Sequence, residues 1–444
     1  MSVRLFMQKI RPVPARRWAV IGLGALSAGL VLFGLRWCFV TWQVHSARQA
    51  LSEGNPSAAV AALRQAESVD PHRAEVAFLL GRALRRAGKL GEAASYLERS
   101  AAAGWPMEEV RLQRELLLVQ SGAFAPAGDF QEEFLSKGAS DDTAEEIYEA
   151  RAKGFYSTYR LGDALLCLEF WLKWRPHARQ ARIWRGEIYE RLERLPEAGQ
   201  DYRAILEHDP QDVEVRIRLA ETMLPRNDAQ GALAEFETCL KIRPNDAAAL
   251  RGRLKCLRRL GELEGVNEGL TALLDRELSA RDRADVLYEL GEMSLYNKAY
   301  HQAIDYLTRS RQADPTYMVV DQSLSIAYAR LGMTELAEET KQRCKQSLAR
   351  GSRLADITRQ MLREPRDPEL RYEAGMILMA EGLKKEAAAW LKTALDCDPS
   401  HRRSHAAMAD YLAEIGDPDG AAQHRKLAGA PGKREQADAR SGRQ

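Results

Sequence analysis

Apolar residues in this chain recur at the spacing of paired amphipathic helices. In residues 284–315, Leu287 and Leu290 share one helix face, and Ala303 and Leu307 share a face of the helix that follows. Residues three or four apart lie on the same side of an α-helix. The segment is therefore predicted to be a helical hairpin, in which two amphipathic helices are joined by a short turn.

The hairpin pattern recurs about every 34 residues along most of the chain. Copies start at residues 40, 74, 108, 145, 179, 213, 247, 284, 318, 368 and 402. The period, with Gly or Ala at the eighth position and Pro near the end of the better copies, resembles the tetratricopeptide repeat family. The resemblance implies an all-α superhelical solenoid of about nine to eleven helix-turn-helix repeats over roughly residues 45–428, in which each repeat buries its apolar faces against its neighbours.

A strongly apolar segment precedes the repeats. Residues 18–35 contain no charged side chain, and after Arg36 the run 37–42 is uncharged again. About 20 apolar residues span a bilayer core. We therefore expect residues 18–42 to form a transmembrane signal anchor. A cleavable signal peptide would have a shorter apolar core, a mitochondrial presequence is a further alternative, and a buried core helix would show a polar outer face.

Charge gives this anchor an orientation. Five basic residues lie in the tail 1–17, and few follow the span. Because the flank richer in Lys and Arg stays inside, the tail is predicted to be cytoplasmic and the repeats periplasmic, on an inner (cytoplasmic) membrane protein. The chain holds 65 basic and 63 acidic residues, but residues 1–52 hold seven basic and no acidic ones. The remainder is mildly acidic, which argues against nucleic acid as a partner.

Composition divides the rest of the chain. Residues 43–351 are predicted to be the main solenoid, and 368–428 to be C-terminal repeats. Between them, 352–367 fits no repeat and carries Pro365, so we expect an irregular helical linker there. Residues 429–444 are rich in Gly, Arg and Gln without apolar periodicity, which predicts a disordered tail.

The residues that could carry chemistry form no catalytic arrangement. His401 and His405 are four apart and could ligate a metal, but His405 falls at a packing position of its repeat. The six cysteines include no CxxC pair and are interpreted as buried free thiols. The sequence therefore predicts no catalytic residue, no metal site and no cofactor, in a protein that is not an enzyme.

The family resemblance also implies where a partner would bind. It places positions 2, 5, 9 and 12 of each first helix in a concave groove that accepts peptides. In the early repeats these positions hold Phe78, Arg82, Arg85, Glu146 and Glu149. The predicted partner-binding residues, at or beside groove positions of later repeats, are Arg251, Lys255, Arg258, Arg259, Tyr288, Glu292, Tyr296, Tyr372 and Met376.

The basic residues of this set allow two interpretations. Arg251, Lys255 and Arg258 share one helix face, so they could accept an acidic peptide or an anionic glycan. Alternatively they form a solvated face that Glu221 and Glu292 of flanking repeats partly neutralise.

The resulting hypothesis is a single-pass, membrane-anchored scaffold or adaptor that binds proteins in its concave groove. The alternative is a non-catalytic accessory subunit of an envelope enzyme complex, in glycan, lipopolysaccharide or lipoprotein assembly. The layout resembles membrane-anchored lipopolysaccharide assembly proteins, but the chain lacks their terminal paired-cysteine module. It also lacks the Lys and Asn arrangement with which co-chaperone relatives hold a terminal carboxylate.

Overall fold

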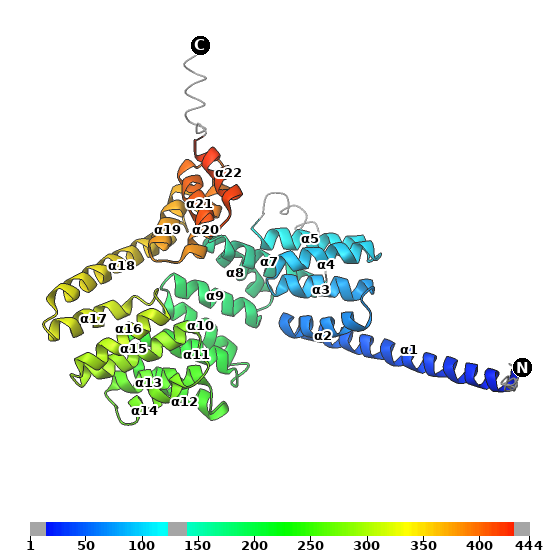
Figure 1. Ribbon diagram of the computed structural model, residues 1–444, viewed down its shortest axis with the longest axis horizontal. Helices are drawn as coiled ribbons and strands as arrows, with labels where there is room; N and C mark the ends of the chain where they lie inside the picture. Colours follow the sequence, from blue (N-terminus) through cyan, green and yellow to red (C-terminus); the bar gives the residue numbers. More distant parts are fainter. Residues whose placement is uncertain (1–14, 123–139, 430–444) are drawn as a thin grey trace, which may run out of the picture. The chain divides into compact units, whose positions relative to one another are not determined.

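The computed structural model describes residues 15–122 and 140–429, with side chains from residue 34 onward. Over these ranges the chain is helical and contains no strand (Figure 1), which confirms the predicted all-α class. It divides into two compact units, an N-terminal unit of residues 1–150 and a C-terminal unit of residues 151–444.

The N-terminal unit is built from successive helices that pack pairwise. They are α1 (Ala15–Ser52), α2 (Pro56–Val69), α3 (Ala74–Arg86), α4 (Leu90–Ala102), α5 (Met107–Gln120) and the first part of α7 (Asp141–Ser157). The pairs α1–α2 and α3–α4 are antiparallel hairpins. Leu63, Leu80, Leu84 and Leu97 are fully buried between them, at the apolar positions of the repeat.

The C-terminal unit continues the same hairpins. Its helices are α8 (Leu161–Trp174), α9 (Arg179–Arg191), α10 (Leu195–Leu206), α11 (Val213–Met223), the 3-10 turn η1 (Leu224–Arg226), α12 (Ala229–Ile242), α13 (Ala247–Leu260), α14 (Val266–Leu274), α15 (Ala280–Tyr296), α16 (Tyr300–Ala313), α17 (Val319–Arg330), α18 (Thr334–Gln360), α19 (Pro368–Ala380), α20 (Lys384–Cys397), α21 (Arg402–Glu414) and α22 (Pro418–Gly429). Asp212, Asp246 and Ser279 cap the first helices α11, α13 and α15 with their side-chain oxygens.

The turn inside each hairpin has one recurring backbone feature. A residue in the left-handed region stands at the fifteenth position of every described repeat that has both its helices. The position is glycine in most repeats, as at Gly88 and Gly261, because glycine has no Cβ to clash in this conformation. Four repeats place another residue there: Tyr159, Glu193, Asn227 and Lys298.

The eighth position of the repeat is a close helix–helix contact. A Cβ added to Gly291 would lie 2.6 Å from Leu307 Cδ2, and one added to Gly81 would lie 2.8 Å from Leu97 Cδ2. Gly375 meets Leu391 in the same way, at 3.0 Å from its Cγ. The second helix therefore packs directly on the first, as the small residue predicted.

The predicted membrane anchor is corrected by the structure. Among the helices of the described residues, none combines the length and the apolar character needed to cross a bilayer. The predicted single-pass localisation in the inner membrane, with periplasmic repeats, is therefore wrong. The side chains of residues 18–33 of the predicted span lie outside the described residues, as does the tail 1–14.

The second half of the predicted span has a different role. Residues 34–52 belong to α1 and form the first helix of a repeat hairpin with α2. Val40, Val44 and Ala47 are buried in the core of the N-terminal unit, and Arg36 Nη2 donates a hydrogen bond to the carbonyl oxygen of Val69, 2.7 Å away. Val40, one of the apolar residues of the predicted span 18–42, is thus part of a repeat core, together with Val44 and Ala47 that follow the span.

The segment predicted as an irregular linker is mostly regular. Helix α18 runs without a break to Gln360, so residues 352–360 continue the second helix of their repeat. Residues 361–367 form the turn that leads into α19, where Asp367 caps the helix. Ile357 and Met361 are buried in the core of the C-terminal repeats. The predicted tail 429–444 lies, after Gly429, outside the described residues.

Two distant parts of the C-terminal unit are in direct contact. Arg371 on α19 is buried, and its Nη1 donates to the carbonyl oxygen of Thr158, 2.7 Å away and 213 residues earlier. Beside it, the ring of Tyr159 stacks on Trp390 of α20 with centroids 3.9 Å apart. The corner between α7 and α8 therefore forms part of the core that α18, α19 and α20 share.

Candidate functional site

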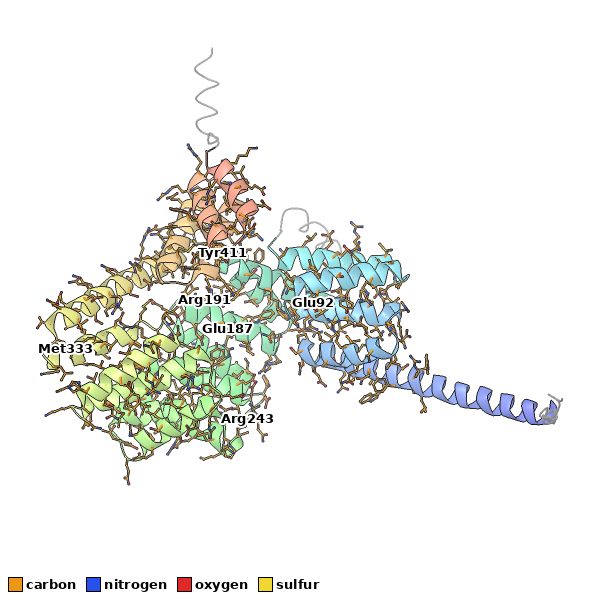
Figure 2. The ribbon with its side chains drawn as sticks, in the orientation of Figure 1. Glu92, Glu187, Arg191, Arg243, Met333 and Tyr411 are labelled. Carbon is orange, nitrogen blue, oxygen red and sulfur yellow. The ribbon has the colours of Figure 1, made fainter. Side chains whose placement is uncertain are left out.

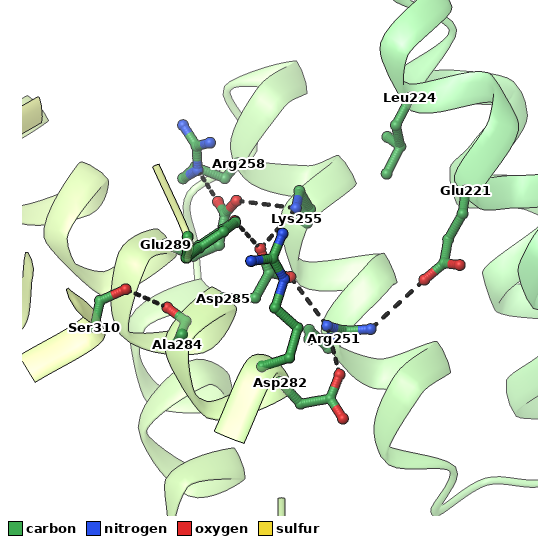
Figure 3. A network of polar contacts seen from close by, with 12 residues as sticks. Glu221, Leu224, Arg251, Lys255, Arg258, Asp282, Ala284, Asp285, Glu289 and Ser310 are labelled. Carbon is green, nitrogen blue, oxygen red and sulfur yellow. Dashed lines mark hydrogen bonds and ion pairs between the residues drawn. The ribbon is translucent and has the colours of Figure 1, made fainter. Parts of the chain in front are cut away.

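Helix α13 carries the predicted basic residues on one face. Arg251, Lys255 and Arg258 follow at steps of four and three, and each reaches toward the neighbouring first helix α15 (Figure 3). Their side chains are largely covered, with 15–20% of each exposed. The structure therefore brings these three residues together, as predicted.

Each of these cations already has carboxylate partners. Arg251 Nη1 lies 2.7 Å from Asp282 and 3.2 Å from Asp285, while Lys255 Nζ lies 2.9 Å from Asp285. Arg258 Nε donates to Glu289, whose side chain is fully buried. Weaker contacts link Arg251 to Glu221 at 3.5 Å and Arg258 to Glu292 at 4.0 Å.

We call this set the α13–α15 charge cluster; its members are Arg251, Lys255, Arg258, Glu221, Asp282, Asp285, Glu289 and Glu292. Carboxylates outnumber cations in it, so the basic band expected from the sequence is neutralised within the chain. Glu289 Oε1 accepts no hydrogen bond, and Lys255 Nζ lies 3.7 Å from it.

Proton affinities in the cluster reflect this packing. Burial alone would raise the pKa of Asp285, but Lys255, the Tyr317 hydroxyl and Arg251 lower it below its usual value. Tyr317 donates its hydroxyl proton to Asp285, and burial next to that carboxylate raises the pKa of Tyr317. Burial, with Glu292 nearby, raises the pKa of Tyr288 to about 12. At neutral pH Asp285 is therefore ionised, while Tyr288 and Tyr317 stay neutral.

The other predicted site residues have varied surroundings. Arg259 Nη1 donates to the carbonyl oxygen of Leu224 at 2.9 Å, so it links α13 to the 3-10 turn η1 that follows α11. Tyr288 packs edge-on against Tyr317, and Tyr296 is 72% exposed at the end of α15. Glu292 accepts a hydrogen bond from Ser323 on α17.

Tyr372 and Met376 lie on α19, apart from the cluster. The Arg403 guanidinium covers the Tyr372 ring at 4.3 Å, and His401 lies beside it with ring centroids 5.7 Å apart. Met376 is partly exposed. The predicted residues thus form one group on α13 and α15 and a second, smaller group on α19.

The charge cluster is part of a longer row of contacts between first helices. Glu187 on α9 (Figure 2) pairs with Arg218 on α11 at 2.9 Å. The row continues from Glu221 through Arg251 to Asp285, and ends with Glu292 and Ser323. In this row, position 9 of one first helix meets position 5 or 6 of the next, as in Glu187 with Arg218 and Glu221 with Arg251, so partners come from neighbouring repeats.

Sequence reasoning missed exposed apolar residues on α17. Val319 and Ile326 occupy positions 2 and 9 of their repeat and are 48% and 47% exposed. They are seven residues apart, so they share one helix face. The same groove positions, applied to residues 318–351 as to other repeats, would have identified them.

Groove positions in the N-terminal unit are closed by the chain itself. Arg85 is fully buried and Glu146 is 3% exposed, and their side chains pair at 2.9 Å. Gln113 Nε2 donates to the same carboxylate, and Gln120 Nε2 donates to the carbonyl oxygen of Arg85. Burial alone would raise the pKa of Glu146, but Arg82, Arg85 and Arg86 lower it to about 2. We call these residues the Arg85–Glu146 cluster.

The buried cysteines and the paired histidines lie in packed parts of the helices. Burial raises the pKa of Cys167, Cys239 and Cys256 to about 11, so these thiols stay protonated. His405 is buried, and its Nδ1 lies 2.9 Å from Nδ1 of His424 across the last hairpin. Within 34–122 and 140–429, no three His, Cys, Asp or Glu side chains are grouped as metal ligands.

Comparison with known families identifies the repeats. Residues 46–108, 149–213 and 349–402 match the tetratricopeptide repeat family model. The chain therefore contains tetratricopeptide repeats, which confirms the resemblance seen in the sequence. The comparison with curated proteins gave no match.

Solved structures similar to the chain share less than a fifth of its residues. A human IFIT1 dimer with m7Gppp-AAAA is 13% identical, with 80% of this chain and 89% of that chain covered and a TM-score of 0.40. A tetratricopeptide repeat protein from Parabacteroides merdae is 18% identical, with 65% and 98% covered and a TM-score of 0.36. MamA from Desulfovibrio magneticus is 19% identical, with 38% and 93% covered and a TM-score of 0.31. At these values the likenesses carry no argument about function.

Proposed function

We propose that this chain is a non-catalytic scaffold that binds a protein or peptide partner on the first helices α15 and α17. The observation that carries the proposal is the exposed groove face of α17, where Val319 and Ile326 are about half exposed. Tetratricopeptide repeats present such faces on consecutive parallel helices, which suits an extended or helical peptide. Apolar side chains exposed on this face contribute binding energy when a partner covers them.

Charged residues lie next to this apolar face. Glu292 bonds to Ser323 of α17, so the α13–α15 charge cluster ends beside the apolar pair. Because Arg251, Lys255 and Arg258 are already engaged by carboxylates, an acidic ligand would have to displace those carboxylates. The acidic-ligand hypothesis stays a prediction, and we propose instead that apolar side chains of the partner contact α17 while the charges fix its register.

The proposal is tested by partner recovery with matched variants of the full chain. Ile326→Asp introduces a charge on the exposed groove face, and Leu336→Asp introduces the same charge at a similarly exposed residue, 44% exposed, on the second helix α18. We expect Ile326→Asp to abolish recovery of the partner and Leu336→Asp to leave it unchanged. Both variants should keep the circular dichroism melting curve of the wild type, because both side chains are exposed.

The reverse pattern, or loss of recovery with neither variant, would contradict this assignment of the face. Reversal of Arg251 and Arg258 is a poor test by itself, because it would place new carboxylates beside Asp285 and the fully buried Glu289. Loss of binding in that variant could therefore follow from unfolding.

A further inference from the structure

The α13–α15 charge cluster presents carboxylates to solvent and keeps its cations inside. Arg251 lies between two of these carboxylates (Figure 3), and the three basic side chains of the cluster are only 15–20% exposed. The carboxylates with larger exposed fractions, of 50%, 38% and 23%, are those of Glu221, Asp282 and Glu292. We call these three residues the acidic rim. Because the cluster has five carboxylates and three cations, the rim carries the excess negative charge.

Further carboxylates extend the negative charge from the acidic rim toward α9. Glu187 and Glu190 lie on α9, and Arg218 on α11 pairs with Glu187 at 2.9 Å. Burial, with Glu221 and Glu187 nearby, raises the pKa of Glu190, although the Tyr202 hydroxyl and Arg218 act in the opposite direction. These carboxylates therefore repel one another, and a cation placed beside them would relieve that repulsion.

At its other end the acidic rim borders the exposed apolar face of α17. Glu292 accepts a hydrogen bond from Ser323, which lies on α17 between Val319 and Ile326. Val319 comes four residues before Ser323 and Ile326 three residues after it, so each apolar side chain is about one helical turn from the Glu292 contact. A ligand that covers the apolar pair therefore places its neighbouring side chains next to a carboxylate.

We infer, building on the function proposed above, that the protein segment that binds α17 is cationic as well as apolar. Its apolar side chains cover Val319 and Ile326, and Lys or Arg side chains beside them meet Glu292 and the rest of the acidic rim. Opposite charges next to an apolar contact speed association and fix its register. The same carboxylates repel an acidic peptide, the phosphates of nucleic acid and an anionic lipid surface, so a basic segment of a protein is the occupant that this face favours.

Three synthetic helical peptides test the charge of the ligand. They share one leucine face and carry lysine, glutamine or glutamate at the other positions. In fluorescence anisotropy with the full chain, we expect the lysine peptide to bind at least roughly tenfold more tightly than the glutamate peptide. Its affinity should fall as NaCl is raised from about 0.05 to about 0.5 M, because salt screens exposed charges. Equal or tighter binding of the glutamate peptide, or no binding of the lysine peptide, would overturn the cationic partner.

Matched variants of the full chain locate the attraction. Glu221→Gln combined with Glu292→Gln leaves three carboxylates against three cations in the cluster, and should raise the dissociation constant of the lysine peptide roughly tenfold. The control combines Glu338→Gln and Glu339→Gln, which change the net charge equally at side chains of α18 that are 55% and 69% exposed. The control should change the dissociation constant less than about twofold. Equal effects of the two pairs would show a nonspecific attraction and overturn the acidic rim as the site.

Ile326→Ser separates this inference from the proposed function. Serine removes the apolar side chain without adding a carboxylate, so it should weaken binding of the lysine peptide. If it does so while the glutamine peptide binds the wild type as tightly as the lysine peptide, the α17 face is retained and the cationic partner is overturned. If Ile326→Ser leaves binding of the lysine peptide unchanged, the α17 face is refuted, and the proposed function with it.

Discussion

The two units place Arg side chains at the same groove positions, with different outcomes. In the N-terminal unit, Arg85 and Glu146 are sealed in the interior together with two glutamines. In the C-terminal unit, Arg258 meets the buried Glu289 but keeps 20% of its own side chain exposed. A groove position is therefore not in itself a binding surface. Burial by neighbouring helices, and the charges those helices carry, decide whether it can meet a partner.

The largest difference between the two units is expected when Glu146 is removed. Glu146→Ala leaves the fully buried Arg85 without its carboxylate, and breaking a buried ion pair from one side costs about 3–5 kcal/mol. We expect unfolding of the full chain to begin at a lower denaturant concentration than in the wild type. Hydrogen exchange should speed up in α3 and α5 and stay unchanged in α15, and equal effects in both units would contradict the distinction.

Acid should act on the same cluster. The folded pKa of Glu146, about 2, lies below its ordinary value of 4.5, so its contribution is present above about pH 4.5 and is lost as pH falls toward 2. A shift of this size corresponds to roughly 3 kcal/mol. Wild-type hydrogen exchange in α3 should therefore accelerate below pH 4.5. In Glu146→Gln this pH dependence should be much weaker; an identical acid profile would assign it to other groups.

A smaller effect is expected in the C-terminal unit. Arg258→Ala leaves Glu289 buried, with Lys255 as its nearest remaining cation at 3.7 Å. Hydrogen bonds to charged groups contribute about 1.5–3 kcal/mol, and the partial exposure of Arg258 places the expected loss toward the lower half of that range. Hydrogen exchange rates in α13 and α15, compared between the variant and the wild type, measure this loss of stability. A loss larger than that of Glu146→Ala would reverse the ranking of the two clusters.

The units should respond alike where their packing is alike. Gly81 and Gly291 occupy the eighth position of their repeats, and an added Cβ would meet Leu97 and Leu307 at 2.8 and 2.6 Å. Gly81→Val and Gly291→Val should each destabilise their unit by about 1–3 kcal/mol through overpacking. Gly351→Ala, which meets nothing within 4 Å on α18, is the control and should not destabilise. Different costs at the two sites would show that the hairpins are not equivalent.

The smallest effect is expected at the exposed rim of the α13–α15 cluster. Half of the Glu221 side chain is exposed, and its distance to Arg251 is 3.5 Å. Exposed ion pairs contribute little, so Glu221→Gln should change unfolding by less than about 0.5 kcal/mol. A loss near that of Arg258→Ala would mean that the exposed pair Glu221–Arg251 stabilises the fold as much as the pair Arg258–Glu289.

Much of the fold could be predicted because the apolar positions of each repeat indicate which helix faces are buried. Leu287, Leu290, Gly291 and Leu307 fall on the predicted faces and are buried or in close contact. The contact of Arg251 with the next first helix was also readable, since first helices of neighbouring repeats lie side by side, although Arg251 and Asp285 stand at positions 5 and 2 of their repeats. The pairing of Arg85 with Glu146, 61 residues on, was not, because it skips a degenerate repeat.

Helix α1 shows why part of the fold was predicted wrongly. Val40 suits a membrane span as well as a repeat core, and apolar spacing alone does not distinguish the two surroundings. The partner-binding residues were harder still. Their type and period predicted which face they occupy, but the exposed fraction of each side chain depends on neighbours that only the folded chain brings together.

The contact between Arg371 and Thr158 has a consequence for how this chain folds. Solenoids contact mainly their nearest neighbours, so they can nucleate anywhere and unfold in parts. Here a hydrogen bond and a stacked aromatic pair join residues more than 200 positions apart, and such a loop closes only after the intervening helices have formed. The C-terminal unit should therefore complete its folding late and lose its end repeats together. These contacts raise its contact order above that of an open row of hairpins, and we expect its unfolding to be more cooperative than that of such a row.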